Sequence, residues 1–170
     1  IVVNQHNSGK PIFPFVVFTS AESHFMIAEA ITKGLASGDA QSYYQTGIRK
    51  AMSLWDVSSA DVENYIATES MALLNGSTDQ NLEKIATQRW IALFTNGYEA
   101  WSVVRDTGYP TELSAGVTDK DIFVLGDTNG VYPQRHRYGS GPYNTNGAEV
   151  EKANSVQGPD KQATKLWWAK

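Results

Sequence analysis

Residues 82–110 constrain the fold of this chain more than any other stretch, because they encode two helices with almost no chain between them. In the first half, apolar residues recur at steps of three and four after Asp79, a candidate N-cap. Asn96-Gly97 then marks a helix end, and a second helical pattern begins at once and closes at Gly108-Tyr109-Pro110. Two helices joined by so short a connection must pack against each other, so the sequence predicts a helical hairpin.

The aromatic side chains on these helical stripes predict the centre of the apolar core. Trp90 and Phe94 belong to the first helix of the hairpin, Tyr98 and Trp101 to the second, and Trp55 falls on a helical stripe further upstream. Aromatic rings bury large apolar areas, so a place on such a stripe favours packing over exposure. We therefore assign Trp55, Trp90, Phe94 and Trp101 to the structural core.

Two further helices are predicted upstream, over about residues 20–33 and 40–55. Thr19 and Glu22 match a capping box at the start of the first helix, and Asp39 can cap the second. Together the two helices have the length of one tetratricopeptide unit, about 34 residues. One unit cannot bury its own apolar face, which predicts that the chain is a fragment and that further helices stack on it in a longer protein.

The predicted organisation is one domain with three parts. A lead-in covers residues 1–18, helical hairpins cover 19–110, and a long irregular segment covers 111–170. The last part carries seven glycines and three prolines, with only a short helix expected near Asn146–Ala153. Disordered chain is poor in aromatic residues, so we expect this aromatic-rich segment to be ordered by wrapping on the helices.

Composition excludes several classes of protein. The net charge is −4 and no run of Lys or Arg reaches four residues, so the electrostatic signature of a nucleic-acid binder is absent and no nucleic acid is expected as a partner. The chain contains no cysteine, which excludes disulfides, a thiolate nucleophile and cysteine-based zinc sites. The sequence has no apolar run of about 18 residues, so no membrane-spanning helix is predicted.

Patterns typical of catalysis or metal binding are sparse. The sequence contains no G-x-S-x-G nucleophile motif, and its three histidines are isolated from one another. Residues 127–130 are weakly similar to a calcium loop but lack the full ligand set, which favours a polar turn. A hydrolase would need a pair of carboxylates facing one cleft. We therefore predict no catalytic residue, no metal and no cofactor.

Aromatic residues outside the helical stripes are the candidates for ligand binding. Sugar rings stack on flat aromatic surfaces, while nearby polar side chains bond their hydroxyl groups. The alternative is that these rings hold the irregular segment on the helices. The candidate residues are Tyr132, Tyr138, Tyr143, Trp167 and Trp168.

Several motifs occur in one order along the chain and carry a resemblance to a known family. They are Ala28-Glu29-Ala30, the run Lys84-Ile85-Ala86-Thr87-Gln88-Arg89-Trp90-Ile91-Ala92-Leu93-Phe94, Asn96-Gly97, Glu99-Ala100-Trp101, Arg105, Thr107-Gly108-Tyr109-Pro110, Tyr132-Pro133-Gln134-Arg135 and Tyr143-Asn144-Thr145-Asn146. From about residue 18 to residue 170, this sequence resembles the C-terminal portion of the SusD/RagB family, in its SusD-like subgroup.

The resemblance implies an all-α fold of tetratricopeptide-like helical hairpins, with the long irregular C-terminal segment wrapped on them. It also implies an outward-facing lipoprotein of the bacterial outer membrane, whose N-terminal lipid anchor is absent from this chain. Such a protein captures a glycan, or in some members a peptide, without enzymatic activity, and delivers it to a SusC-like TonB-dependent transporter. Gly139-Ser140-Gly141-Pro142 departs from the P-x-S-E pattern expected there. The alternatives are a helical protein-interaction scaffold and a peptide-binding member of the same family.

Overall fold

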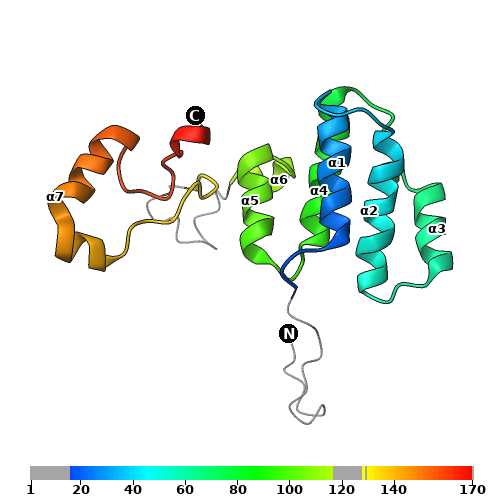
Figure 1. Cartoon of the computed structure of the whole chain (residues 1–170), viewed down its shortest axis with the longest axis horizontal. Coiled ribbons are helices and arrows are strands. Elements are labelled where there is room, and N and C mark those ends of the chain that lie inside the picture. The colour runs from blue at the N-terminus through cyan, green and yellow to red at the C-terminus, as the bar shows by residue number, and fades with distance from the viewer. Residues whose placement is uncertain (1–15, 117–127, 129, 170) are drawn as a thin grey trace, which may run out of the picture.

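The computed structural model describes residues 16–116, 128 and 130–169. Within these residues the secondary structure is helical and contains no strand, which confirms the predicted all-α fold (Figure 1). The predicted lead-in lies largely outside the described residues, as do Asp127 and Asn129 of the calcium-like turn. The elements are α1 (Ser20–Thr32), α2 (Ala40–Leu54), α3 (Ser59–Thr68), η2 (Ser70–Ala72), α4 (Thr78–Ala92), α5 (Gly97–Thr107), α6 (Thr111–Ser114), α7 (Ser140–Gln157) and η4 (Trp167–Ala169).

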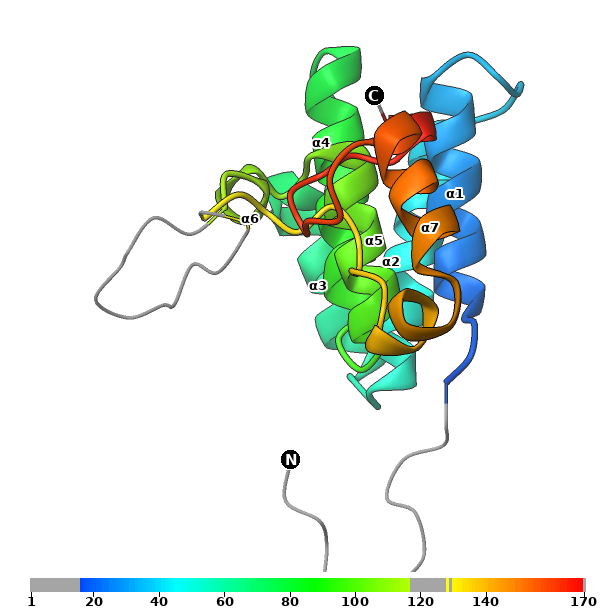
Figure 2. The same cartoon turned by 90° about the vertical axis from the view of Figure 1, so that its left-hand side faces the viewer.

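The first five helices form a layer in which neighbours pack side by side. Helices α1 and α2 form a hairpin, α4 packs against both of them, and α3 lies along the outer side of α2. Helix α5 packs on the other side of α4, so it forms the edge of the layer that faces the C-terminal residues (Figures 1 and 2). The predicted hairpin of residues 82–110 is therefore present as α4 and α5.

The cap of α4 differs from the one that the sequence predicts, whereas the cap of α1 agrees with it. Ser77, not Asp79, caps α4, because its hydroxyl accepts from the Gln80 amide at 3.3 Å and the Gln80 side chain accepts from the Ser77 amide at 2.9 Å. This reciprocal pair satisfies two amide groups that have no partner within the helix. At α1 the Thr19 hydroxyl accepts from the Glu22 amide at 3.2 Å, as predicted.

The Glu22 carboxylate has a different role from the one that the capping box predicts. Its side chain is 4% exposed and Oε1 accepts from Arg89 Nη2 on α4 at 2.9 Å. Glu29, seven residues after Glu22 on α1, lies 3.8 Å from the same guanidinium group. The two carboxylates and Arg89 therefore tie α1 to α4.

The core between α1, α2 and α4 contains one large aromatic pair. Phe25 and Tyr44 are both fully buried, with ring centroids 6.0 Å apart. The Tyr44 hydroxyl donates to the carbonyl groups of Met71 and Lys84, so no polar atom of the ring is left unpaired. Gly47 lies where its missing Cβ would come within 3.0 Å of the Phe25 ring, which shows how closely α1 and α2 approach.

Two of the four aromatic residues predicted for the core are on the surface. Phe94 is 75% exposed and Trp55 is 40% exposed, and their rings pack edge-on against each other at 5.6 Å. Both residues lie just beyond a helix end, where the helical period no longer decides which way a side chain faces. Trp90 is partly buried against Ala86, Leu93 and Val103. Trp101 is partly buried on the face of α5 that contacts the C-terminal residues.

The C-terminal residues contain more helix than the sequence predicts. In place of a short helix near Asn146–Ala153, α7 has 18 residues and a kink at Asn146, where the backbone is not helical. Figure 1 shows α7 beyond α5, on the side away from α1, α2 and α3. The segment therefore reaches the helical layer through α5, and α7 stands apart from that layer.

Candidate functional site

The Tyr-Pro-x-Arg motif is fixed to α5 by two side chains of that helix. Trp101 Nε1 donates to the carbonyl oxygen of Pro133 at 2.7 Å, and Arg105 Nη1 donates to that of Gln134 at 3.3 Å. Trp101 and Arg105 are four residues apart and so share one face of α5. Helix α5 thus holds residues 133 and 134 against it through two hydrogen-bond donors on one face.

The chain that follows α7 lies beside the Tyr-Pro-x-Arg motif. The Gln134 amide donates to the carbonyl oxygen of Gln162 at 2.7 Å, which places the turn after α7 beside the motif. Between these residues and α5 lies a cleft of about 500 Å³. Its lining residues are Gly97, Tyr98, Trp101, Pro133, Arg135, His136 and Gln162.

Three rings line the cleft at angles to one another. The His136 ring centroid is 5.2 Å from that of Trp101 and 5.8 Å from that of Tyr98, with interplanar angles of 55° and 56°. The Tyr98 side chain is 72% exposed, so its ring remains available to a ligand. The guanidinium carbon of Arg105 lies 4.5 Å from the Trp101 ring centroid. The cleft thus offers apolar ring faces beside groups that form hydrogen bonds, the combination that sugar recognition requires.

A buried ion pair supports the wall of the cleft. Arg135 Nη2 donates to Asp160 Oδ1 at 3.0 Å, and both side chains are 5% exposed. Asp160 also accepts from the Tyr138 amide and from the Tyr143 hydroxyl at 2.9 Å. Arg135 Nη1 is buried and has no hydrogen-bond partner among the residues that the structure describes. The pair fixes the residues before and after α7 to each other.

The five residues that the sequence assigns to ligand binding do not line this cleft. The polar groups of Tyr138 and Tyr143 bond within the segment, since the Tyr138 hydroxyl accepts from Gln157 and the Tyr143 hydroxyl donates to Asp160. Tyr132 is partly buried, and this burial raises the pKa of its phenol. Trp167 and Trp168 are 75% and 56% exposed and form an edge-to-face pair at 5.4 Å. Ligand binding by these residues stays a prediction.

The sequence does not identify the cleft residues as one site, because they share no common pattern. The helical stripe of α5 predicts core positions for both Trp101 and Tyr98, which is wrong for Tyr98 because its side chain is 72% exposed. His136 follows directly after the Tyr-Pro-x-Arg motif, so its position beside a docked strip was the one available clue. Gln162 lies in chain without any periodic pattern, and only the fold brings it to the site.

A separate apolar hollow of about 420 Å³ lies where α2 and α4 end. The exposed rings of Trp55 and Phe94 form part of its wall, together with Trp90 and Ile91. Polar groups are few in this hollow, which fits an apolar partner better than a sugar.

Residues 16–116, 128 and 130–169 hold no group of three or more His, Cys, Asp or Glu side chains placed to bind a metal ion. None of the helices formed by these residues has the length and apolar character needed to cross a membrane.

Comparison with known proteins agrees with the helical hairpins and the motifs docked on α5. The profile of the SusD-like family described as "Starch-binding associating with outer membrane" matches residues 2–139. The chain therefore belongs to the SusD-like family. The comparison with curated proteins gives no match.

Solved structures of this family share the fold. A SusD-like protein from Bacteroidetes matches with a TM-score of 0.80 at 29% identity, over 91% of this chain and 30% of its own. A SusD homologue from Bacteroides uniformis matches with a TM-score of 0.74 at 31% identity, over 88% of this chain and 36% of its own. A chitin-binding SusD homologue from Flavobacterium johnsoniae matches with a TM-score of 0.72 at 27% identity, over 88% and 36%. The chain thus spans about a third of the length of these proteins.

Proposed function

We propose that this chain takes part in the non-enzymatic capture of an oligosaccharide at the cell surface, and that the cleft beside α5 contacts the sugar. The observation that carries this proposal is the arrangement of Tyr98, Trp101 and His136 around a cleft of about 500 Å³. The volume falls in the range of small-molecule sites, about 300–1,000 Å³. The description of the family and the chitin-binding relative support a sugar as the ligand.

The proposal extends to delivery of the sugar to a SusC-like TonB-dependent transporter, from a lipoprotein that faces outward at the outer membrane. The family profile carries an outer-membrane description, which supports this location. Co-purification of a SusC-like transporter with the protein from bacterial outer membranes tests the delivery step. Recovery of the protein without any transporter, under detergent conditions that preserve outer-membrane complexes, would contradict it.

Binding by this chain alone should be weak. One exposed ring and a few hydrogen bonds at the rim, each of about 0.5–1.5 kcal/mol net, give a binding free energy of about 4 kcal/mol, which corresponds to millimolar affinity. NMR titration with starch-type and chitin-type oligosaccharides measures affinities in this range. Replacement Tyr98→Ala should weaken binding by about five- to tenfold, since it removes the exposed stacking surface. Tyr43→Ala, which removes a partly exposed ring on α2, is the matched control and should leave binding unchanged.

A second candidate function is protein interaction, either as a helical scaffold or as a peptide-binding member of the family. The hollow beside Trp55 and Phe94 favours it, because its wall is apolar and partly exposed. Loss of peptide or protein binding in a Phe94→Ala variant, with no effect of Tyr98→Ala, would favour this function over sugar capture.

A further inference from the structure

The two regions beside the cleft carry opposite charge. Residues 16–116 contain six Lys and Arg against twelve Asp and Glu, whereas residues 130–169 contain five Lys and Arg against three Asp and Glu. The whole chain has a net charge of −4, so the excess of positive charge in its C-terminal segment is local. A local field of this kind attracts ligands of the opposite sign.

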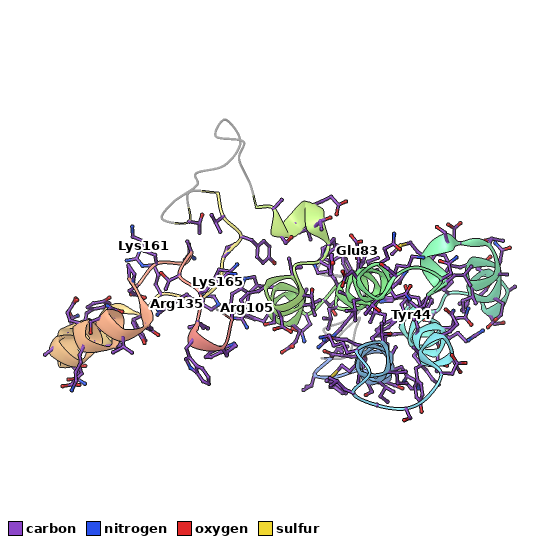
Figure 3. The ribbon with its side chains drawn as sticks, turned by 90° about the horizontal axis from the view of Figure 1, so that it is seen from above. Tyr44, Glu83, Arg105, Arg135, Lys161 and Lys165 are labelled. Atoms are coloured by element: carbon purple, nitrogen blue, oxygen red, sulfur yellow. The ribbon has the colours of Figure 1, made fainter. Side chains whose placement is uncertain are left out.

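Four cationic side chains belong to this segment and to α5, and one of them, Arg135, lines the cleft. Figure 3 shows Arg105, Arg135, Lys161 and Lys165 on the side of α5 that faces the C-terminal segment. Two hydrogen bonds hold these parts of the chain together, because the Arg105 side chain donates to the Gln134 carbonyl oxygen and the Gln134 amide donates to that of Gln162, the neighbour of Lys161. Arg135 and Gln162 themselves line the cleft.

The positive charge at the cleft is only partly neutralised. Asp160 is the carboxylate nearest to Arg135, and its oxygens are already engaged by Arg135, Tyr138 and Tyr143. Lys161 and Lys165 are exposed, and neither pairs with a carboxylate of the described chain. Arg105 packs on Trp101 and bonds a carbonyl group, so its charge likewise has no carboxylate partner there.

We propose that the cleft beside α5 binds an acidic oligosaccharide, one that carries carboxylate or sulfate groups, in preference to a neutral one. This inference rests on the proposed function and names the class of sugar. The rings of Tyr98 and Trp101 contact the sugar face, while the cations along the rim meet its acidic groups. The cleft and its aromatic rings favour an oligosaccharide over an anionic membrane, because a flat membrane surface would be bound by the positive charges alone.

The test uses pairs of probes in which one form carries more negative charge than the other on the same sugar backbone. A trisaccharide of galacturonic acid should bind the chain at least about tenfold more tightly than its fully methyl-esterified form at low salt, measured by NMR titration. A sulfated chondroitin disaccharide, compared with its desulfated form, tests whether sulfate serves as well as carboxylate. The preference should shrink as NaCl rises from about 20 mM to 500 mM, because salt screens exposed charges.

Two pairs of substitutions locate the effect. Lys161→Gln with Lys165→Gln should reduce binding of the acidic trisaccharide about five- to tenfold and leave binding of its methyl ester unchanged. Lys50→Gln with Lys152→Gln removes the same charge from exposed lysines on α2 and α7, and should change neither.

The outcomes separate this inference from the proposed function. Equal binding of acidic and neutral forms, or binding of neutral oligosaccharides alone, would overturn the inference and leave sugar capture standing. Absence of binding to every oligosaccharide would overturn both. Binding to vesicles with anionic phospholipid, without binding to either acidic sugar, would show that the cationic side chains contact a membrane surface. That result would overturn the inference.

Discussion

The helical layer of α1–α5 and the C-terminal residues 130–169 are held together by different forces. The layer is built on buried apolar side chains, with Phe25, Tyr44 and Ile48 almost inaccessible to solvent. The C-terminal residues contribute only Val150 to the buried apolar set of the described chain, and depend on hydrogen bonds and on the Arg135–Asp160 pair. The candidate site lies where these two regions meet, with one wall from each.

Because the two regions are held together by different forces, some changes should unfold the protein and others should only loosen the site. Loss of apolar burial lowers the stability of a whole cooperative unit. Loss of a buried polar contact in a segment with little apolar packing should open that segment locally.

The largest effect is expected at the centre of the helical layer. Phe25→Ala should lower the free energy of unfolding by about 3–5 kcal/mol, because it empties a fully buried aromatic site beside Tyr44. Urea denaturation followed by circular dichroism measures the change. Phe94→Ala makes the same substitution at a 75% exposed ring and should cost less than about 1 kcal/mol. Equal losses would show that the burial assignment is wrong.

A free-energy cost of similar size, confined to the C-terminal residues, is expected for a change at Asp160. Asp160→Ala leaves the buried Arg135 without its partner, which typically costs about 3 kcal/mol or more. Because apolar packing in residues 130–169 is sparse, the cost should appear as local opening. Limited proteolysis should cut residues 138–165 faster, with the urea midpoint of the helical layer little changed.

The control for Asp160 is Glu149→Ala on α7. Glu149 is 61% exposed and lies 3.6 Å from Lys152, so its removal should leave the proteolysis rate as it is. A fall in the urea midpoint of the whole chain in Asp160→Ala would show that the two regions unfold as one.

A smaller loss is expected where α1 and α2 approach most closely. Gly47→Ala places a Cβ within 3.0 Å of the Phe25 ring and should cost about 1–3 kcal/mol through the shift that it forces. Gly97→Ala at the start of α5 meets no atom within 4 Å and should change stability by less than about 0.5 kcal/mol. Equal stability of the two variants would contradict the close packing of α1 on α2.

The smallest effect concerns the exposed pair on α2 and α3. Arg49 donates to Glu63 at 2.7 and 2.9 Å, and this hydrogen bonding lowers the pKa of the Glu63 carboxyl group. The stability that the pair contributes is therefore present above the ordinary pKa of glutamate and is lost as the pH falls through the lowered pKa. NMR titration of Arg49→Gln should show the Glu63 pKa returning upward. An unchanged pKa would mean that the pair does not form in solution.

The sequence predicts the helical layer well because its signals are local. The spacing of apolar residues and the stop at Gly108 place α4 and α5, but α4 ends at Ala92, and Asn96 caps the start of α5 where the sequence predicts a helix end. The same period fails at Trp55 and Phe94, which lie beyond the helix ends and point outward. Periodicity decides which face is buried only while the helix continues.

The cleft was beyond prediction for a different physical reason. Its wall depends on contacts between residues far apart in sequence, such as Trp101 with Pro133 and Gln134 with Gln162. Residues 130–169 have no period that would show which side chains face α5. The sequence supplied the motif at Tyr132–Arg135, but only the fold shows that Tyr98 and His136 meet beside it.

The central claim is that a sugar binds beside α5, between the helical layer and the C-terminal residues. The most direct test is an NMR titration that follows the indole signals of the five tryptophans as an oligosaccharide is added. Trp101 lines the cleft and donates its indole N–H to Pro133, so its signal should shift while those of Trp55, Trp167 and Trp168 stay in place. Shifts at Trp167 and Trp168 with a constant Trp101 signal would contradict the account.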